Sequence, residues 1–283
     1  MTYLITGATG NVGSLVTERL IARGIRPRIF VRDPEKARTH YGDRVEIHTG
    51  DLSDPKSLSL AFKEVDVLFL VNSGPNIAKL DALAADIVLT EGVKRIVKLS
   101  SYDAREQNVG TGVWHAAGEA AIRERGVPCT FVQPSGFMSN ALYWARSIKN
   151  EEVLRSATGQ GTIPFIHPAD IADVAVEAMT REEYIGQSLA ITGPESLSYA
   201  QISERIGAAI GKHIRFEDMS EEEVRAQQVA WNTPPPLVEA RLSIFRAIRE
   251  GRLAKVTDTV TRVLRRKPIA FDQWVKENAA FFL

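Results

Sequence analysis

Short, largely apolar runs alternate with helix-length amphipathic segments along the first half of the chain. The runs cover residues 3–5, 28–31, 45–47, 65–71, 95–99 and 129–132. Apolar strands are typical of a sheet covered on both faces, and strand–helix alternation indicates right-handed crossovers between parallel strands. We therefore expect an α/β fold built on a doubly wound parallel sheet, the Rossmann arrangement.

Glycine ends three of the intervening helical segments. Gly24, Gly92 and Gly126 each stand between a helical pattern and the next apolar run. Glycine readily adopts the positive φ angle with which many helices end. Three such stops, each followed by a predicted strand, strengthen the doubly wound interpretation.

The alternation becomes less regular in the second half of the chain. We expect strands at 163–166 and 188–192, a helix at 170–179, an extended piece at 214–216, a proline-rich break at 232–236 and an amphipathic segment at 271–281. Helices should predominate after residue 193.

These patterns predict two parts. Residues 1–133 should form the Rossmann domain, rejoined by about 162–192. Residues 134–161 and 193–283 should form a smaller, mostly helical substrate or cap region over the carboxyl edge of the sheet.

A glycine-rich turn follows the first predicted strand and opens the first helix. Gly7 permits a tight turn, Gly10 lets backbone approach a pyrophosphate, and Gly13 permits close packing of helix on strand. The helix, expected from Asn11 onward, would direct its positive end at the phosphates. The spacing G-x-x-G-x-x-G in this strand–turn–helix context predicts a dinucleotide site that also includes Thr9 and Val12.

The end of the second strand distinguishes the two nicotinamide cofactors. An acidic side chain there accepts from the ribose 2′-hydroxyl of NAD, whereas a guanidinium binds the 2′-phosphate of NADP. This chain has Arg32 at that place, with Lys36 beyond it. NADP(H) is therefore the expected cofactor. NAD(H) stays an alternative because Asp33, beside Arg32, could itself bind the ribose.

Composition excludes several other classes. The chain has 283 residues, and its 35 basic and 35 acidic side chains cancel, so it shows no general attraction to nucleic acid or membrane. Its one cysteine, Cys129, excludes an internal disulfide, and the five histidines lack metal-ligand spacing. No signal peptide or membrane-length apolar run is found, so we expect a cytoplasmic protein with a small-molecule substrate and no metal. The oligomeric state is left open.

The glycine turn, Arg32, residues 50–52 and residues 99–101 together resemble the atypical short-chain dehydrogenases. Within that group the chain is similar to the NmrA-like branch, which contains quinone reductases, isoflavone-reductase-like relatives and redox-sensing regulators. Residues 168–175, 192–195 and 271–281 fit the same branch.

The resemblance implies roles for residues outside the glycine turn. It places Asp51 and Leu52 beside the adenine, and Asn72, Ser73 and Gly74 along the cofactor. It places Ser100, Ser101 and Pro134 near the nicotinamide. The side chains expected on the substrate side are Phe137, Met138, Tyr143 and Trp144. Cap or core packing is the simpler account of each substrate-side residue, and a loop or strand-end cap is an equal alternative for Asp51, Ser100 and Ser101.

The catalytic signature of typical short-chain dehydrogenases is absent. No Tyr-x-x-x-Lys occurs in the chain. Alignment of the relatives' motifs places His115 where they keep a lysine. Its imidazole, four residues before Glu119, could exchange a proton near pH 7. Tyr102 is a second candidate donor. A helix residue that does no chemistry is an equal alternative for His115.

Two functions remain open. The first is an NADP(H)-dependent oxidoreductase that transfers hydride to a small quinone, carbonyl or imine. The second is a non-catalytic NADP(H)-sensing regulatory protein. Fold analogy alone does not choose between them.

Overall fold

The structure is a computed structural model that describes residues 1–106 and 108–283. The chain forms two compact units. The first contains residues 1–101, 114–133 and 168–189. The second contains residues 102–113, 134–167 and 190–283, and it is nearly as long as the first.

The first unit is built on a seven-stranded sheet with the strand order β3-β2-β1-β4-β5-β6-β9. The strands are β1 (Tyr3–Thr6), β2 (Arg28–Val31), β3 (Glu46–Thr49), β4 (Val67–Val71), β5 (Arg95–Leu99), β6 (Cys129–Pro134) and β9 (Ser188–Ile191). The first six pair in parallel, with Ile5 opposite both Ile29 and Phe69. The predicted Rossmann fold is therefore confirmed.

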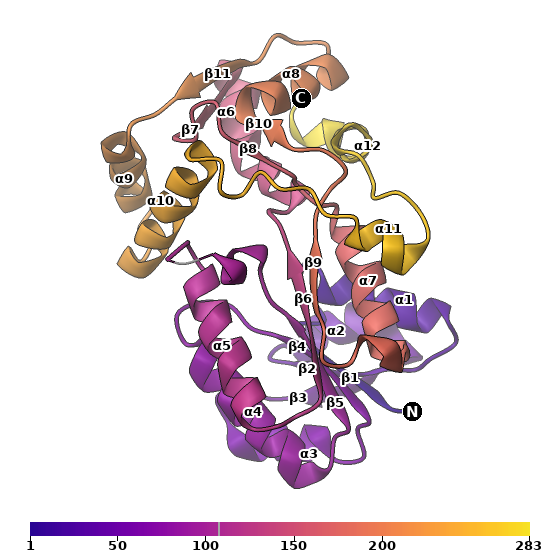
Figure 1. Ribbon diagram of the computed structural model, residues 1–283. Helices are drawn as coiled ribbons and strands as arrows, with labels where there is room; N and C mark the ends of the chain where they lie inside the picture. Colours follow the sequence, from indigo (N-terminus) through magenta and orange to yellow (C-terminus); the bar gives the residue numbers. More distant parts are fainter. Residues whose placement is uncertain (107) are drawn as a thin grey trace. The chain divides into compact units, whose positions relative to one another are not determined.

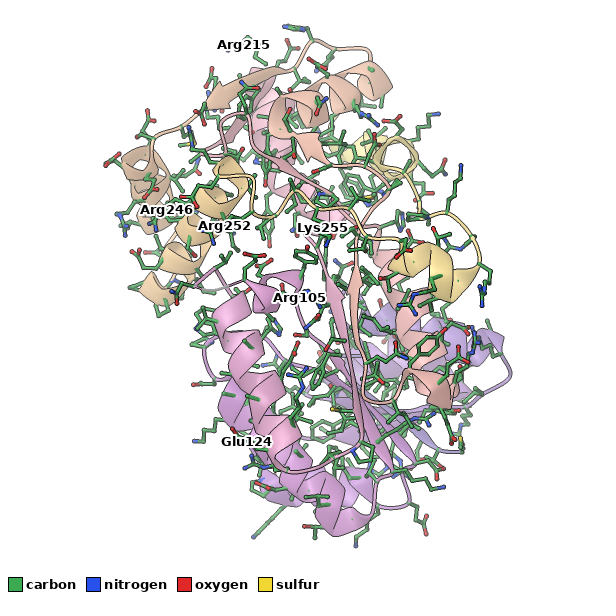
Figure 2. The ribbon with its side chains drawn as sticks, viewed as in Figure 1. Arg105, Glu124, Arg215, Arg246, Arg252 and Lys255 are labelled. Carbon is green, nitrogen blue, oxygen red and sulfur yellow. The ribbon has the colours of Figure 1, made fainter. Side chains whose placement is uncertain are left out.

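Helices cover both faces of this sheet. They are α1 (Gly13–Ala22), α2 (Pro34–Tyr41), α3 (Pro55–Phe62), α4 (Ile77–Glu91), α5 (Gly112–Glu124) and α7 (Pro168–Thr180), with short 3-10 turns at Gly42–Arg44 and Glu182–Tyr184. Figure 1 shows α4 and α5 on one face and α1 and α7 on the other. Side chains fill the layers between them, whereas Glu124 at the end of α5 points outward (Figure 2). Gly24, Gly92 and Gly126 all adopt positive φ, which confirms the three predicted helix stops.

The second unit is mostly helical and also holds two small sheets. Its helices are α6 (Ala145–Glu151), α8 (Tyr199–Ile210), α9 (Glu221–Ala230), α10 (Pro235–Arg249), α11 (Thr259–Leu264) and α12 (Phe271–Asn278), with 3-10 segments at Tyr102–Arg105, Met138–Trp144 and Ala279–Phe281. β7 (Val153–Ser156) pairs in parallel with β11 (Arg215–Asp218), and β8 (Thr162–Ile163) pairs with β10 (Leu197–Ser198). The predicted break at 232–236 covers part of the turn after α9 and the first two residues of α10, Pro235 and Pro236.

The strand predicted at 163–166 is wrong in its extent. Only Thr162–Ile163 forms a strand, and Ile166 makes an isolated bridge to Phe137. Pro164 has no N–H to donate, so it interrupts the ladder between these two pieces. The short strands β7 and β10 were not predicted, since two to four residues of mixed polarity give no periodic signal.

Candidate functional site

The glycine turn after β1 is shaped by two close approaches of backbone. Gly7 has φ +64°, and its carbonyl accepts from the Gly10 N–H at 2.9 Å. A Cβ at Gly13 would lie 2.2 Å from the Gly7 oxygen, whereas a Cβ at Gly10 would meet only that oxygen, at 3.2 Å. Gly13 therefore serves packing, as expected, and Gly10 leaves open space. The helix begins at Gly13 rather than at Asn11.

A cavity of about 440 Å³ lies at the carboxyl ends of the central strands of the first unit. Its walls are Thr6, Gly7, Thr9, Gly10, Phe30, Val31, Arg32, Gly50, Asp51, Leu52, Val71, Asn72, Ser73 and Leu80. The strand order reverses between β1 and β4, and in open α/β sheets ligands bind at this switch point. The structure therefore brings Gly7, Gly10 and Arg32 to one cavity.

Other predicted cofactor residues lie outside the walls of this cavity. They are Asn11, Val12, Gly13, Lys36, Gly74, Ser100, Ser101 and Pro134. Val12 is buried and precedes α1, and Pro134 belongs to the second unit. For these residues the cofactor role stays a prediction.

Arg32 and Asp33 have different roles at the end of β2. Arg32 is exposed and lines the cavity. The Asp33 carboxylate instead caps α2, where it accepts from the Lys36 N–H at 3.1 Å. The acid that could have bound a ribose hydroxyl is thus engaged by its own helix.

Asp51 contributes a carboxylate to the wall next to Arg32. Its Oδ1 accepts from the backbone N–H and the hydroxyl of Ser53, at 2.8 and 2.6 Å. These hydrogen bonds, with a smaller contribution from the Arg32 charge, lower the pKa of Asp51. Asp51 is therefore ionised at neutral pH, and both of its side-chain oxygens are acceptors.

Asn72 is held in the wall by a buried ion pair. Its amide donates to Oδ1 of Asp81 on α4, while its own Oδ1 is buried with no hydrogen-bond partner. Oδ2 of Asp81 lies 2.9 Å from Nζ of Lys98 on β5, and both side chains are 0% exposed. Asp81 and Lys98 thus hold Asn72 in the cavity wall. The Oδ1 atom of Asn72 remains without a hydrogen-bond donor.

His115 is affected by its own burial and by this cluster. Burial, and second the Lys98 charge, lower the pKa of His115 from 6.5 to about 3. Its Nδ1 is buried and has no hydrogen-bond partner. A pKa this low does not fit the proton exchange expected near pH 7, and a catalytic role for His115 stays a prediction.

The hydrogen-bond donors of the Glu119 carboxylate are side chains other than His115. It accepts from the Ser100 hydroxyl at 2.5 Å, from the Gln133 amide at 2.7 Å and from Arg123 at 3.1 Å. The carboxylate is 4% exposed, so these donors replace its lost water. Ser100 is thereby fixed at the end of β5.

The remaining predicted residues belong to the second unit. Tyr102 is 7% exposed within its apolar core, and burial raises the pKa of its phenol, which makes it a weaker acid. Met138 is buried in the same core, and Phe137 bridges to Ile166. Tyr143 and Trp144 line a separate cavity in this unit.

Sequence reasoning missed Lys98 and Asp81. The signal was present, because a lysine interrupts the apolar run at 95–99 and an aspartate stands among the apolar residues of 77–91. A charge inside a fully buried strand requires a partner. Gly50 and Leu80, also in the wall, carry no comparable signal.

Two features are absent from the described part of the chain. No group of three or more His, Cys, Asp or Glu side chains comes together there in a way that could hold a metal ion. Among the same residues, no helix is both long and apolar enough to cross a membrane.

Known proteins resemble this chain over its full length. It is 35% identical to (4-alkanoyl-5-oxo-2,5-dihydrofuran-3-yl)methyl phosphate reductase of Streptomyces griseus, over 99% of this chain and 98% of that protein. It is 31% identical to NAD(P)H azoreductase of Xenophilus azovorans, with the same coverage.

Solved structures agree on the fold. The NADPH-dependent quinone oxidoreductase QOR2 of Escherichia coli, solved with NADPH, has a TM-score of 0.89 at 21% identity, covering 98% of this chain and 99% of that one. The structural neighbours include NmrA-like, quinone-reductase and isoflavone-reductase-like proteins, as the sequence motifs indicated. A family model described as NAD(P)H-binding matches residues 7–182, more than half of the chain, and the chain therefore belongs to this NAD(P)H-binding family.

Proposed function

We propose that this protein is an NADP(H)-dependent reductase that transfers hydride to a small quinone, carbonyl or imine. The observation that carries the proposal is the 440 Å³ cavity at the switch point of the sheet, bounded by the glycine turn and by Arg32. Family membership and the named reductases among its relatives support it.

The residues of this cavity fit a dinucleotide phosphate. At Gly10 a side chain would meet only the Gly7 carbonyl oxygen, which leaves space for a pyrophosphate, and the positive end of α1 follows this turn directly. The buried, unpartnered Oδ1 of Asn72 is an acceptor that awaits a donor. Asp51 supplies a second acceptor.

Arg32 favours NADP(H) over NAD(H). No described carboxylate forms an ion pair with it, and its exposed guanidinium lines the cavity. Asp33 faces its own helix terminus, so it does not offer the ribose contact typical of NAD sites. A charge-assisted hydrogen bond to phosphate is worth about 1.5–3 kcal/mol.

The bound cofactor would supply the hydride, and the chain's residues would supply binding and orientation. Asp81 and Lys98 hold the Asn72 side chain, and Glu119 holds the Ser100 hydroxyl. His115 is neutral at pH 7, and the pKa of Tyr102 is raised, so neither is a strong acid there. This favours a quinone, whose reduced oxygen is weakly basic and takes its proton from water.

The test is NADPH oxidation, followed by its absorbance, with 1,4-naphthoquinone, benzaldehyde and a cyclic imine as acceptors. We expect turnover, fastest with the quinone. Gly10→Val is the control, because its side chain would occupy the phosphate space, while its Cβ would meet only the Gly7 carbonyl oxygen, at 3.2 Å. That variant should stay folded and lose both NADPH binding and turnover.

The second candidate function is a non-catalytic NADP(H) sensor. The neutral His115 and the weakly acidic Tyr102 favour it over ketone reduction. NADPH binding measured by calorimetry, together with no oxidation in the presence of any acceptor, would establish this alternative and contradict the reductase proposal.

A further inference from the structure

A second cavity, of about 320 Å³, lies entirely within the second unit. It is formed by the segment 143–156, which runs from the 3-10 helix through α6 to β7, together with α9 and α10. We refer to it as the α9–α10 cavity. None of its lining residues belongs to the first unit, so it is distinct from the cavity beside the glycine turn.

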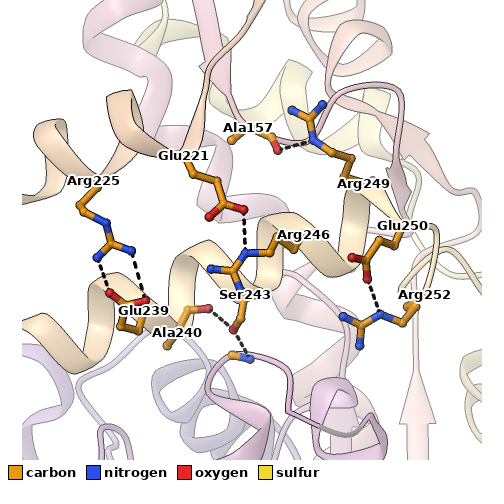
Figure 3. A network of polar contacts seen from close by, with 11 residues as sticks. Ala157, Glu221, Arg225, Glu239, Ala240, Ser243, Arg246, Arg249, Glu250 and Arg252 are labelled. Carbon is orange, nitrogen blue, oxygen red and sulfur yellow. Dashed lines mark hydrogen bonds and ion pairs between the residues drawn. The ribbon is translucent and has the colours of Figure 1, made fainter.

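Ion pairs hold its two helical walls together. Arg225 of α9 pairs with Glu239 of α10, and Glu221 of α9 pairs with Arg246 of α10 at 2.6 Å (Figure 3). Figure 3 shows both pairs bridging the two helices. The two helices that form this wall are therefore linked to each other by two exposed ion pairs.

Aromatic rings line the cavity where solvent can reach it. Trp231 is 57% exposed and Tyr143 is 69% exposed, although such rings are usually buried. Trp144 is fixed, because its indole N–H donates to the Arg155 carbonyl at 3.1 Å and its ring packs edge-on against Tyr199. The cavity thus offers flat apolar surface to a planar ligand.

The same cavity contains guanidinium groups that no described carboxylate neutralises. Arg155 is neutralised by Glu151 and Glu217, at 2.6 and 2.7 Å. Arg146 and Arg241 also line the cavity, and no described carboxylate forms an ion pair with either. Arg241 donates to the amide oxygen of the buried Gln228 at 2.9 Å, which fixes its guanidinium without cancelling its charge.

A buried hydroxyl completes the lining. Ser156 is 1% exposed, and its Oγ has no hydrogen-bond partner. A buried hydroxyl without a partner costs free energy, so a ligand acceptor would recover it. Thr158, which is equally buried and unpartnered, does not line the cavity and serves as a matched control.

We propose that the α9–α10 cavity binds a small aromatic anion, with the ring against Trp144 and Trp231 and the anionic group near Arg241, Arg146 and Ser156. Oxyanions are the groups that guanidinium and hydroxyl donors recognise together. All residues of this site belong to the second unit. Binding of the anion can therefore be tested independently of the reductase activity.

The test is calorimetric titration of the cofactor-free full-length protein with naphthalene-2-sulfonate. The uncharged naphthalene-2-sulfonamide is the matched probe, since it keeps the ring and removes the charge. We expect saturable 1:1 binding of the sulfonate, binding at least tenfold weaker for the sulfonamide, and weakening of the sulfonate complex by added salt.

Variants locate the binding site. Arg241→Met should weaken sulfonate binding about tenfold or more, Arg146→Met by less because that side chain is exposed, and Ser156→Ala about fivefold. Arg262→Met and Thr158→Val, both outside the cavity, should leave binding unchanged. If Arg241→Met fails to fold, the exposed Arg146→Met carries the charge test.

Equal affinity for the two probes, or sulfonate binding that survives both Arg146→Met and Ser156→Ala, would overturn the proposal. Absence of any saturable sulfonate binding to the folded protein would do the same. Quenching of tryptophan fluorescence that disappears in Trp231→Phe would add support, because it places the ring at this cavity rather than elsewhere.

Discussion

The two units bury different kinds of side chain. The first unit encloses charged and polar groups, with Lys98 and Asp81 0% exposed in the sheet and on α4. The second unit encloses an aromatic cluster, in which Phe165, Phe271, Trp274 and Phe282 lie 5.7–6.5 Å apart, centroid to centroid, in successive pairs.

This difference distinguishes side chains that hold a residue of the site in place from side chains that only stabilise the fold. Burying an ion pair is often no more stabilising than burying apolar residues of the same size, so the Lys98–Asp81 pair is not needed for stability. Its contact with Asn72, in the wall of the cavity beside the glycine turn, gives it a positioning role. The aromatic cluster needs no such explanation, because apolar burial is favourable by itself.

The largest expected effect comes from breaking the buried pair on one side. Asp81→Ala leaves the Lys98 ammonium unpaired and should lower the free energy of unfolding by about 3–5 kcal/mol in urea titrations. Asp86→Ala, on the same helix, breaks the exposed pair with Arg125 and should cost under about 1 kcal/mol. The double variant Asp81→Leu/Lys98→Met should regain most of the stability but not NADPH affinity. Loss of stability equal to that of Asp86→Ala would contradict this account.

A comparable loss of stability should follow when a large side chain is removed from the aromatic cluster. Phe271 is 1% exposed, so Phe271→Ala should cost about 3–5 kcal/mol, and Phe271→Leu less because it refills part of the volume. NADPH affinity should be unchanged in whatever fraction remains folded. A selective loss of NADPH binding in Phe271→Leu would show that the contrast between the units is wrong.

A smaller effect distinguishes two glycines of the same turn. A Cβ at position 13 would meet the Gly7 carbonyl at 2.2 Å, so Gly13→Ala should destabilise the protein by about 1–3 kcal/mol. Gly10→Ala meets the same oxygen at 3.2 Å and should melt within a few degrees of the parent protein, with weakened NADPH binding. Thermal melts and cofactor titration of both variants measure the two effects separately, and equal melting temperatures would contradict the assignment.

The ratio of the affinities for NADPH and NADH should change by about tenfold when Arg32 is replaced. Arg32→Ala should remove most of the preference for NADPH over NADH, since a charged hydrogen bond is worth about 1.5–3 kcal/mol. Arg38→Ala is the control, because Arg38 pairs with Glu35 and does not line the cavity. Calorimetry that finds equal affinities for both cofactors in the parent protein would rule the preference out.

The smallest effect near neutral pH concerns His115. Its folded-state pKa, about 3, lies below the unfolded value of 6.5, so the unfolded chain takes up the proton first as the pH falls. The stability from the neutral ring is complete above pH 6.5 and is lost as the pH falls toward 3. His115→Asn should therefore reduce the fall of the melting temperature between pH 6.5 and pH 3. His213→Gln, at an exposed position, should leave that fall unchanged. A rate ionisation near pH 7 that disappears in His115→Asn would contradict the neutral ring.

The sequence by itself determined the Rossmann sheet, its helix stops and the glycine turn. Those features depend on local periodicity and on single residues, such as Gly24 and Gly92, whose φ angles are set within a few positions of the chain. Arg32 was also predictable, because its distance from the turn is fixed by one strand–helix–strand unit.

Only the tertiary structure decided the surroundings of the candidate acids and the site in the second unit. His115, Lys98 and Asp81 stand far apart in sequence, so neither their burial nor the lowered pKa of His115 can be read from spacing. The α9–α10 cavity joins residues 143–156 to residues beyond 218, and its unpaired guanidiniums are recognisable only once the carboxylates that neutralise Arg155 are placed. Burial and charge pairing are sums over neighbours in space, and the sequence order does not contain them.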